Sequence, residues 1–268
     1  MVTLSLFATS AFAAPTPNAL GTCDTTGPIE IEATAGDLGP TAYPTLKDAF
    51  DAINAGTPQG VINIEVCGNT TETASAVLNA SGAGSAVYAS IAIKPVGGAA
   101  RTISGAIAAG SALIDLNGAD NVTIDGLKTG GNSLTISNTT VSATSGTSTI
   151  RFLGGATSNT ITNASILGSA TMTVATNGGN IYFATDAVTT NGNDNNTISN
   201  SDIGPAGANL PTKGVYGNGS TTTTAIGNSG IVINNNNIFD FFGAALPSSG
   251  VYVASGCNNW SITNNRLY

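Results

Sequence analysis

The sequence predicts an all-β protein: a single-stranded parallel β-helix, or solenoid, with a short N-terminal capping helix. The first observation behind this prediction is that only 8% of the 268 residues are charged, whereas exposed helix faces need Lys, Glu and Arg. The polar residues are instead 38 Thr and 29 Asn beside 34 Gly, which suit strands and turns better than helix interiors. The second observation is an internal repeat in the second half of the chain, which indicates stacked copies of one unit.

Each copy of the repeat is centred on an isoleucine in a short polar segment. These anchors are Ile124, Ile161, Ile198, Ile233 and Ile262, at spacings of 37, 37, 35 and 29 residues. A single coil cannot bury its apolar side alone, so we expect the coils to stack with the anchors pointing into one core. The alternative is a β-sandwich, whose strands recur about every 8–12 residues without a longer period. The preserved spacing favours the solenoid.

A small or amide residue follows each anchor by two positions. It is Gly126 in the first copy and then Asn163, Asn200, Asn235 and Asn264. Both residue types tolerate left-handed backbone angles, so these positions are expected to be corners of the coil. Asparagines at the same corner of successive coils are expected to hydrogen-bond to one another as a ladder.

Other apolar segments in each copy predict further strands in the coil. One lies upstream of each anchor, at residues 113–116, 150–152, 181–183, 215–216 and 251–253. Another position, five residues after four of the anchors, holds Ile166, Ile203, Ile238 or Leu267. The third and fourth copies carry longer connections, so we expect inserts around residues 185–195, 204–213, 217–229 and 240–249 to be presented as loops.

The N-terminal part predicts a cap, residues 14–60, that includes a helix at 44–56. Thr45 is the expected N-cap, Asp48 follows in the first turn and Gly56 ends the helix. Strands at 61–66 and 87–95 then begin the solenoid, residues 61–268. We expect this cap to cover the first coil, because the open end of a solenoid exposes apolar side chains and strand edges. The chain stops directly after a rung strand, so we expect a solenoid truncated at its C-terminal end.

The first residues predict export. Ala11-Phe12-Ala13 is a small-x-small cleavage signal after a short apolar run, so residues 1–13 are expected to be a signal peptide. An N-terminal strand is the alternative. In an exported protein Cys23 and Cys67 are candidates for a disulfide, although the sequence does not prove the pairing. Cys257 is expected to be a small buried apolar residue. No later apolar stretch reaches the roughly 20 residues of a membrane span.

Composition excludes several classes of function. The chain has no His, which removes His-based acid–base catalysis, Ser-His and Cys-His dyads and His-ligated metals. With 7 basic and 15 acidic residues the net charge is −8 and no basic groove is apparent, which argues against nucleic-acid binding. We expect no catalytic residue, cofactor or metal site.

The segment Asn121-Val122-Thr123-Ile124-Asp125-Gly126-Leu127 resembles the rung of the right-handed parallel β-helix, the pectin-lyase-like fold. Residues 43–56, 91–95 and 234–239 resemble parts of large exported repeat proteins of bacterial surfaces. The resemblance covers about residues 40–268 and implies a right-handed solenoid. It is specific for the fold and weak for activity.

Enzymes of this fold include pectate lyases, pectin methylesterases and polygalacturonases. The polygalacturonase-like pattern has an Asp-Asp pair, a Gly-His-Gly and an Arg-x-Lys, and none of these occurs here. The Arg-x-Pro-x-x-Arg pattern of pectate lyases is also missing. Acidic residues cluster in sequence in the first and third copies, at Asp115, Asp120 and Asp125 and at Asp186, Asp194 and Asp202. A Ca²⁺ or sugar site is one interpretation of these clusters, but corner chemistry explains them more simply.

Aromatic residues provide a second test of function. Tyr182 and Tyr252 each lie between apolar residues of a strand, so they are expected to point outward, where they could stack on sugar rings. The sequence therefore predicts a non-catalytic extracellular or surface scaffold, adhesin-like or glycan-contacting, whose partner is a glycan or a cell-surface molecule. The alternative is a carbohydrate-active enzyme, either a polysaccharide lyase or a glycoside hydrolase, or a fragment of one.

Overall fold

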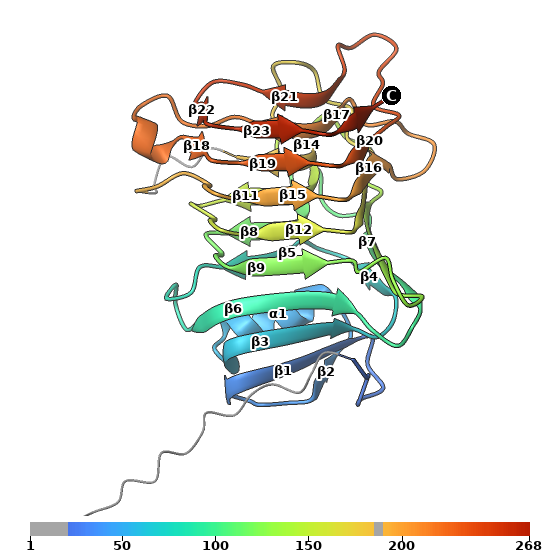
Figure 1. Ribbon diagram of the computed structural model, residues 1–268, viewed down its shortest axis with the longest axis vertical. Coiled ribbons are helices and arrows are strands. Elements are labelled where there is room, and N and C mark those ends of the chain that lie inside the picture. Colours follow the sequence, from blue (N-terminus) through green and yellow to red (C-terminus); the bar gives the residue numbers. More distant parts are fainter. Residues whose placement is uncertain (1–20, 185–189) are drawn as a thin grey trace, which may run out of the picture.

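A computed structural model describes residues 21–184 and 190–268 as a parallel β-solenoid (Figure 1). The expected signal peptide, residues 1–13, lies outside the described residues. Three long sheets run along the solenoid axis, and the described residues contain one α-helix, near the N-terminal end. The all-β solenoid with a short N-terminal helix is thus confirmed.

Sheet A forms the front of the molecule in Figure 1 and contains the strands of the anchor isoleucines. The first three strands in its spatial order are antiparallel neighbours and the later ones are parallel. In spatial order the strands are β2 (Thr41–Tyr43), β1 (Ile29–Gly36), β3 (Pro58–Val66), β6 (Tyr88–Pro95), β9 (Val122–Asp125), β12 (Thr160–Thr162), β15 (Thr197–Ser199), β19 (Val232–Asn234) and β23 (Ser261–Thr263).

The other two long sheets are parallel throughout and complete each coil. Sheet B contains β4 (Thr70–Glu72), β7 (Ala100–Gly105), β10 (Ser133–Asn138), β13 (Ser165–Gly168), β16 (Asp202–Pro205), β20 (Asn237–Ile238) and β24 (Arg266–Leu267). Sheet C contains β5 (Ala76–Asn79), β8 (Ala112–Asn117), β11 (Ser148–Leu153), β14 (Gly179–Phe183), β17 (Lys213–Gly217) and β21 (Ser249–Val253). A short pair joins β18 (Asn228–Ser229) to β22 (Cys257–Asn258), and a 3₁₀ turn, η1, spans Thr224–Ile226.

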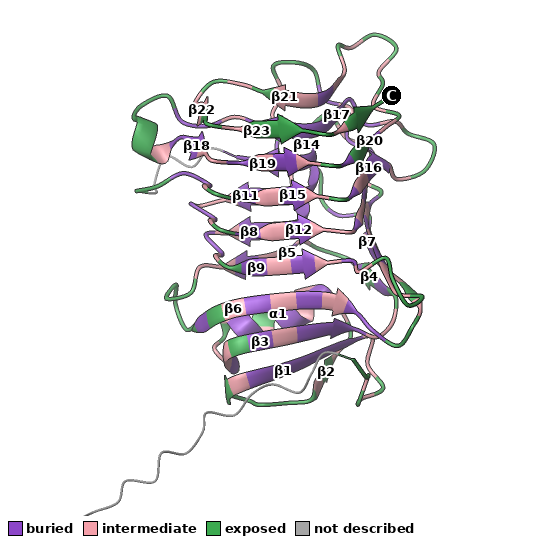
Figure 2. Ribbon diagram, in the orientation of Figure 1, coloured by how far each residue is buried: buried purple, intermediate pink, exposed green. Residues whose placement is uncertain are grey.

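The anchor isoleucines lie in one register column of sheet A. Ile124 pairs with Ile161, and the column continues through Ile198 and Ile233 to Ile262. It also extends backwards through Ile93, Ile64 and Ile31, which the repeat period did not identify. Ile124 to Ile233 are completely buried, whereas Ile262 in the last coil is 44% exposed because no strand follows β23 in sheet A (Figure 2).

The N-terminal helix α1 (Leu46–Asn54) packs four apolar side chains into the end of the core: Leu46, Ala49, Phe50 and Ile53. The hydroxyl of Thr45 accepts a hydrogen bond from the Asp48 N–H, as the N-cap prediction requires. The buried Glu72 carboxylate also accepts hydrogen bonds from the N–H groups of Leu46 and Lys47 at 3.0 Å. A carboxylate from sheet B therefore completes the helix N-terminus, and the sequence analysis did not predict this.

The four corner asparagines, Asn163, Asn200, Asn235 and Asn264, all have left-handed backbone angles, with φ between 52° and 57°. The expected amide ladder among them is largely absent, because only Asn235 donates to another of the four, Asn200, at 2.8 Å. Gly126 also differs from expectation, since its φ is not left-handed. A Cβ there would collide with the carbonyl oxygen of Asn163, so close backbone approach requires the glycine.

Amide ladders do exist, but they lie inside the coil rather than at the exposed corners. The buried Asn196 side chain accepts hydrogen bonds from both the N–H and the Nδ2 of Asn159, at 2.9 Å each. The same pair of bonds joins Asn193 to Asn228 and Asn236 to Asn265. The tract 191–196 has no helix or strand, but Asn193 and Asn196 within it are buried.

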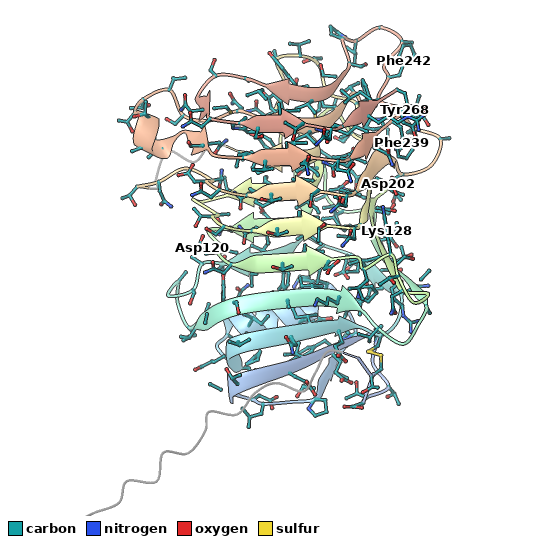
Figure 3. All side chains as sticks on the ribbon, viewed as in Figure 1. Asp120, Lys128, Asp202, Phe239, Phe242 and Tyr268 are labelled. Carbon is teal, nitrogen blue, oxygen red and sulfur yellow. A yellow bond between two sulfur atoms is a disulfide. The ribbon has the colours of Figure 1, made fainter. Side chains whose placement is uncertain are left out.

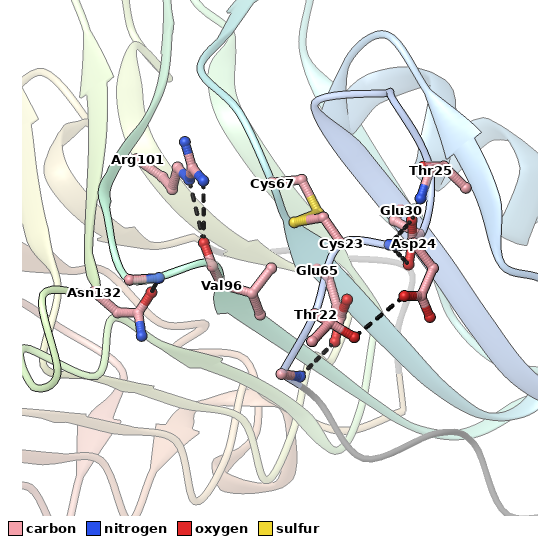
Figure 4. Close-up of a disulfide and its surroundings, with 12 residues drawn as sticks. Thr22, Cys23, Asp24, Thr25, Glu30, Glu65, Cys67, Val96, Arg101 and Asn132 are labelled. Atoms are coloured by element: carbon pink, nitrogen blue, oxygen red, sulfur yellow. Dashed lines mark hydrogen bonds between the residues drawn. A yellow bond between two sulfur atoms is a disulfide. The ribbon is translucent and has the colours of Figure 1, made fainter.

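Cys23 and Cys67 form a disulfide that ties the segment before β1 to the end of β3 (Figure 4). Cys257 is a free thiol and is only partly buried. Burial raises its pKa. Among the described residues, no helix has the length and apolar character needed to cross a membrane.

Candidate functional site

The acidic residues of the rungs are engaged at corners and in ion pairs. Asp120 accepts hydrogen bonds from the N–H and hydroxyl of Thr157 at 2.7 Å, and Asp125 accepts from the Leu127 N–H and the Asn163 amide. Asp194 accepts from the Ser229 N–H at 2.7 Å, and burial raises its pKa. Asp186 lies outside the described residues. These contacts are corner chemistry.

Two rung carboxylates pair with basic residues. Asp115 is 4% exposed and accepts a hydrogen bond from the Arg151 Nε of the next coil at 3.0 Å. Lys128 reaches Asp202 at 2.7 Å, and both lie along the same edge of the molecule in Figure 3. Burial alone would raise the pKa of Asp202, but hydrogen bonds from Lys128 and Asn237 hold it below its ordinary value. Both pairs are contacts between coils.

The outward-facing tyrosines of sheet C form a stack, but they do not form an open stripe. Tyr182 packs on Tyr216 at 5.5 Å between ring centroids, and Tyr216 packs on Tyr252 at 5.4 Å. Tyr182 and Tyr216 are only 5% and 4% exposed. The expected direction is correct, but two of the three rings are covered, which removes most of the proposed sugar-stacking surface.

Lys213 lies within this tyrosine stack and joins it to a neighbouring connection. Its ammonium lies 4.1 Å from the centre of the Tyr216 ring and donates to the carbonyl oxygens of Val174 and Thr176. Lys213 is 1% exposed, and burial lowers its pKa to about 8. The end of the insert expected at 204–213 is therefore buried structure rather than a presented loop. The Tyr216 hydroxyl also donates to Asn177, so the segment around 174–177 covers the stack.

The outer face of sheet A is a surface of uncharged polar side chains. One column runs through Thr123, Thr160, Thr197, Val232 and Ser261, at matched positions of successive coils. A parallel column, two residues further along each strand, runs through Asp125, Thr162, Ser199, Asn234 and Thr263. We call these the first and second polar columns. Apart from Asp125 they carry only hydroxyl, amide and methyl groups.

The two polar columns differ in how much of their hydrogen bonding is already satisfied. In the second column Ser199 donates to the Thr162 hydroxyl at 3.0 Å, and Thr263 donates to the Asn234 amide oxygen at 3.0 Å. In the first column no hydrogen bond from the described residues occupies the hydroxyls of Thr123, Thr160 or Thr197, which are half-buried. The first column therefore presents unused donors and acceptors at a repeat of about 4.8 Å.

Exposed loops project beside the last coils. The connection 217–229 carries η1 and exposes Thr221 to Thr224, and the connection 240–249 exposes Phe242 at 60%. Figure 3 places Phe239, Phe242 and Tyr268 together near the C-terminal end, and the rings of Phe239 and Tyr268 stack at 6.0 Å. Trp260 packs edge-on against Phe183 and so belongs to the core.

The N-terminal end of the sheet A face carries a group of carboxylates. Glu30 and Glu65 pair directly across β1 and β3, and Glu32 lies two residues further along β1. Asp24 lies in the N-terminal segment next to Glu30 (Figure 4). Burial raises the pKa of Glu65 to about 7, the charges of Glu30, Glu32 and Asp24 raise it as well, and the Gly21 N–H lowers it. The sequence analysis did not identify this group, although Ile29-Glu30-Ile31-Glu32 alternates as a half-buried strand does.

A shallow cavity of about 150 Å³ opens near this group. Gly21, Lys94 and Val96 line one part of it and Leu127 and Asn132 another. Leu127 and Lys128 both have left-handed backbone angles although neither is a glycine. The cavity lies between the N-terminal segment and the loop after β9.

The fold and this polar face define a β-solenoid protein whose anchor coils present mostly uncharged polar side chains on the outer face of sheet A. Comparison with known proteins adds no relative: no protein-family model, no curated protein and no solved structure matches the chain.

Proposed function

We propose that this protein is a non-catalytic extracellular scaffold that binds a neutral polysaccharide along the outer face of sheet A. The single observation that carries the proposal is the first polar column, Thr123, Thr160 and Thr197, whose hydroxyls have no hydrogen-bond partner among the described residues. A polysaccharide carries hydroxyl groups at regular intervals, so it can form hydrogen bonds with a row of protein hydroxyl groups without any charged residue.

Two further features support a binding rather than a catalytic role. Several described rung carboxylates already serve in corner bonds and ion pairs, as at Asp120 and Asp115, which supports a structural role for them. The tyrosine stack beside Lys213 is mostly covered. Binding is therefore expected to depend on hydrogen bonds rather than on ring stacking. An adhesin-like role would follow if the polysaccharide belongs to a cell surface.

The exported location is part of the same proposal. The disulfide between Cys23 and Cys67 supports an oxidising compartment, as does the cleavage signal at 11–13. We propose residues 1–13 as the signal peptide, 14–60 as the cap and 61–268 as the solenoid. We also propose that the coils are of the right-handed, pectin-lyase-like and bacterial type, on the resemblance of the Asn121–Leu127 segment.

The test is binding of the full chain to a panel of neutral insoluble polysaccharides, with release of reducing ends followed in parallel. Wild-type protein is expected to bind a member of the panel, and the Thr160→Val/Thr197→Val double variant to bind at least about tenfold more weakly because two hydroxyl contacts are lost. Thr135→Val is the matched control, since Thr135 is a half-buried threonine at an alternate position of a sheet B strand.

The outcomes separate the two candidate functions. Absence of binding across the panel, or equal weakening by Thr135→Val, would overturn the glycan-binding face. Release of reducing ends that scales with protein concentration would instead establish the carbohydrate-active enzyme that the sequence left as the alternative.

A further inference from the structure

The negative charge of this protein is concentrated near its N-terminal end. Residues 21–72 hold eight of the fifteen acidic residues and one of the seven basic ones, a net charge of −7 out of −8. All four glutamates, Glu30, Glu32, Glu65 and Glu72, lie in this part of the chain. Glu72 has a structural role at the start of α1, but the other three face outward on β1 and β3.

Three of these acids converge tightly. One carboxylate oxygen each from Asp24, Glu30 and Glu32 lies within 4.8 Å of the other two. A cation between them would lie near the oxygen distances of about 2.3–2.6 Å that Ca²⁺ adopts. Asp24 is exposed and leaves the group open to solvent, whereas Glu30 and Glu32 are 0% and 5% exposed.

A fourth carboxylate gives an independent indication of a ligand. Glu65 is 2% exposed and stands directly opposite Glu30 on the same face of the sheet, so the two side chains are neighbours. Its Oε1 accepts a hydrogen bond from the Gly21 N–H at 2.9 Å, but its buried Oε2 has no partner. Buried charged oxygens are normally hydrogen-bonded, paired with a cation or bound to a metal.

Within residues 21–184 and 190–268, no basic side chain forms an ion pair with this group. None of the ion pairs among the described residues involves Asp24, Glu30, Glu32 or Glu65. Lys94 is the register neighbour of Glu65 on β6, but it forms no ion pair with it. The group therefore lacks the charge that would ordinarily balance it.

A disulfide and hydrogen bonds fix the backbone around the carboxylate group without a bound cation. The Cys23–Cys67 disulfide fixes Asp24 above the end of β3, two residues beyond Glu65 (Figure 4). The N–H groups of Asp24 and Thr25 donate to Glu30 and orient its carboxylate. Thr25 also has a buried hydroxyl without a partner. A preorganised set of oxygens of this kind favours binding.

We propose that Asp24, Glu30 and Glu32 form a binding site for a divalent hard cation, Ca²⁺, at the N-terminal end of sheet A, with the Glu65 carboxylate and its unpartnered Oε2 on the neighbouring strand. All three donors are carboxylate oxygens, which Ca²⁺ prefers, and an irregular set of oxygens suits Ca²⁺ better than the strict octahedron of Mg²⁺. The sequence predicted no metal site. This one lies at the N-terminal end of the sheet A face and does not depend on polysaccharide binding.

The experiment is calorimetric titration of the full chain, after treatment with EDTA, with CaCl₂ and separately with MgCl₂. We expect one Ca²⁺ per chain, weaker binding of Mg²⁺, and a higher melting temperature in Ca²⁺ than in EDTA. Asp24→Asn and Glu32→Gln are each expected to weaken Ca²⁺ binding about tenfold or more, because affinity follows the charge of the ligand set. Asp51→Asn, an exposed carboxylate on α1, is the control and is expected to leave binding unchanged.

The design remains decisive if a buried variant fails to fold. Asp24 is exposed, so Asp24→Asn leaves the core intact and decides the outcome by itself. Absence of Ca²⁺ binding by the wild type at millimolar concentration would overturn the site. Unchanged affinity in Asp24→Asn would show that the ion binds elsewhere, and equal affinity for Mg²⁺ would overturn the assignment to Ca²⁺.

Discussion

The isoleucine column of sheet A allows the same substitution to be compared at two positions of one structural repeat. Ile161 and Ile262 occupy equivalent register positions, but Ile161 is completely buried and Ile262 is 44% exposed. Substitution of either by alanine removes three carbon atoms from the side chain. The difference between the two free energies of unfolding therefore measures burial within the solenoid.

The expected magnitudes follow from these exposures. At about 0.8 kcal/mol for each buried carbon, Ile161→Ala loses about 2.4 kcal/mol of transfer free energy. The cavity left between Ile124 and Ile198 raises the loss to roughly 3–4 kcal/mol, within the usual range for such changes. At Ile262 only about half of the transfer term applies and no closed cavity forms, so Ile262→Ala is expected to lose about 1 kcal/mol.

The assay is urea denaturation followed by far-UV circular dichroism. The free energy of unfolding of each variant is compared with that of the wild type, with the same dependence on urea concentration for both. The reasoning would be refuted by equal losses for Ile161→Ala and Ile262→Ala. A loss below about 1 kcal/mol for Ile161→Ala would also refute it, because the column would then not be the core of a stacked solenoid.

Two further predictions concern buried polar groups. Asn196→Ala removes the partner of the Asn159 N–H, the Asn159 amide and the Ala156 carbonyl, so denaturation should show a loss of about 3 kcal/mol or more in the free energy of unfolding. Asn200→Gly, at an exposed left-handed corner, should change the free energy of unfolding by less than about 0.5 kcal/mol. Similar losses for the two variants would contradict the ladder. Burial lowers the pKa of Lys213 to about 8, so between pH 8 and 10.5 the unfolded chain binds more protons than the folded one. The free energy of unfolding of the wild type, relative to that of Lys213→Met, should therefore rise by about 1–3 kcal/mol from pH 8 to pH 10.5. A difference that stays flat or falls over this range would contradict the prediction. Burial raises the pKa of Tyr182 to about 12 and also raises that of Tyr216.

The period of the anchors was sufficient to predict the solenoid. A fixed spacing of similar segments has few structural solutions, and each copy also contained the apolar positions of the other two sheets, as at Ile166 and Ile203. Ile93 and Ile64 were missed because no Asn or Gly follows them two positions later, where the later copies have one.

The amide ladders were predicted at the wrong positions. Asn159 and Asn196 lie 37 residues apart, Asn193 and Asn228 lie 35 apart, and Asn236 and Asn265 lie 29 apart, which are the anchor spacings themselves. The periodic signal was therefore present in the sequence. Residue type and spacing placed the ladder at the four corner asparagines, whereas only the register of the coils shows which other amides turn inward.

The covered tyrosines and the carboxylate group could not be predicted from local patterns. Alternation gives the direction of Tyr182 along its strand, but the segment around 174–177 that lies over the stack comes from another connection. In the same way, Glu65 meets Glu30 only because β1 and β3 are antiparallel neighbours, and Asp24 meets both because the disulfide holds it there. Such contacts depend on tertiary structure rather than on sequence period.

Stacking itself explains why so few residues of this protein are charged. A charge at a repeated position would face its own copy about 4.8 Å away in the next coil, a repulsion of about 0.9 kcal/mol in water and about 3.5 kcal/mol at an effective dielectric constant of 20. Uncharged side chains at such positions avoid this repulsion, and some hydrogen-bond to the next coil, as Ser199 does to Thr162. Glu30 and Glu65 are the exception, because two carboxylates stand on adjacent strands without a basic partner. The carboxylates of Glu30 and Glu65 therefore depart from the uncharged pattern of the coils, and a bound divalent cation would remove the repulsion between them.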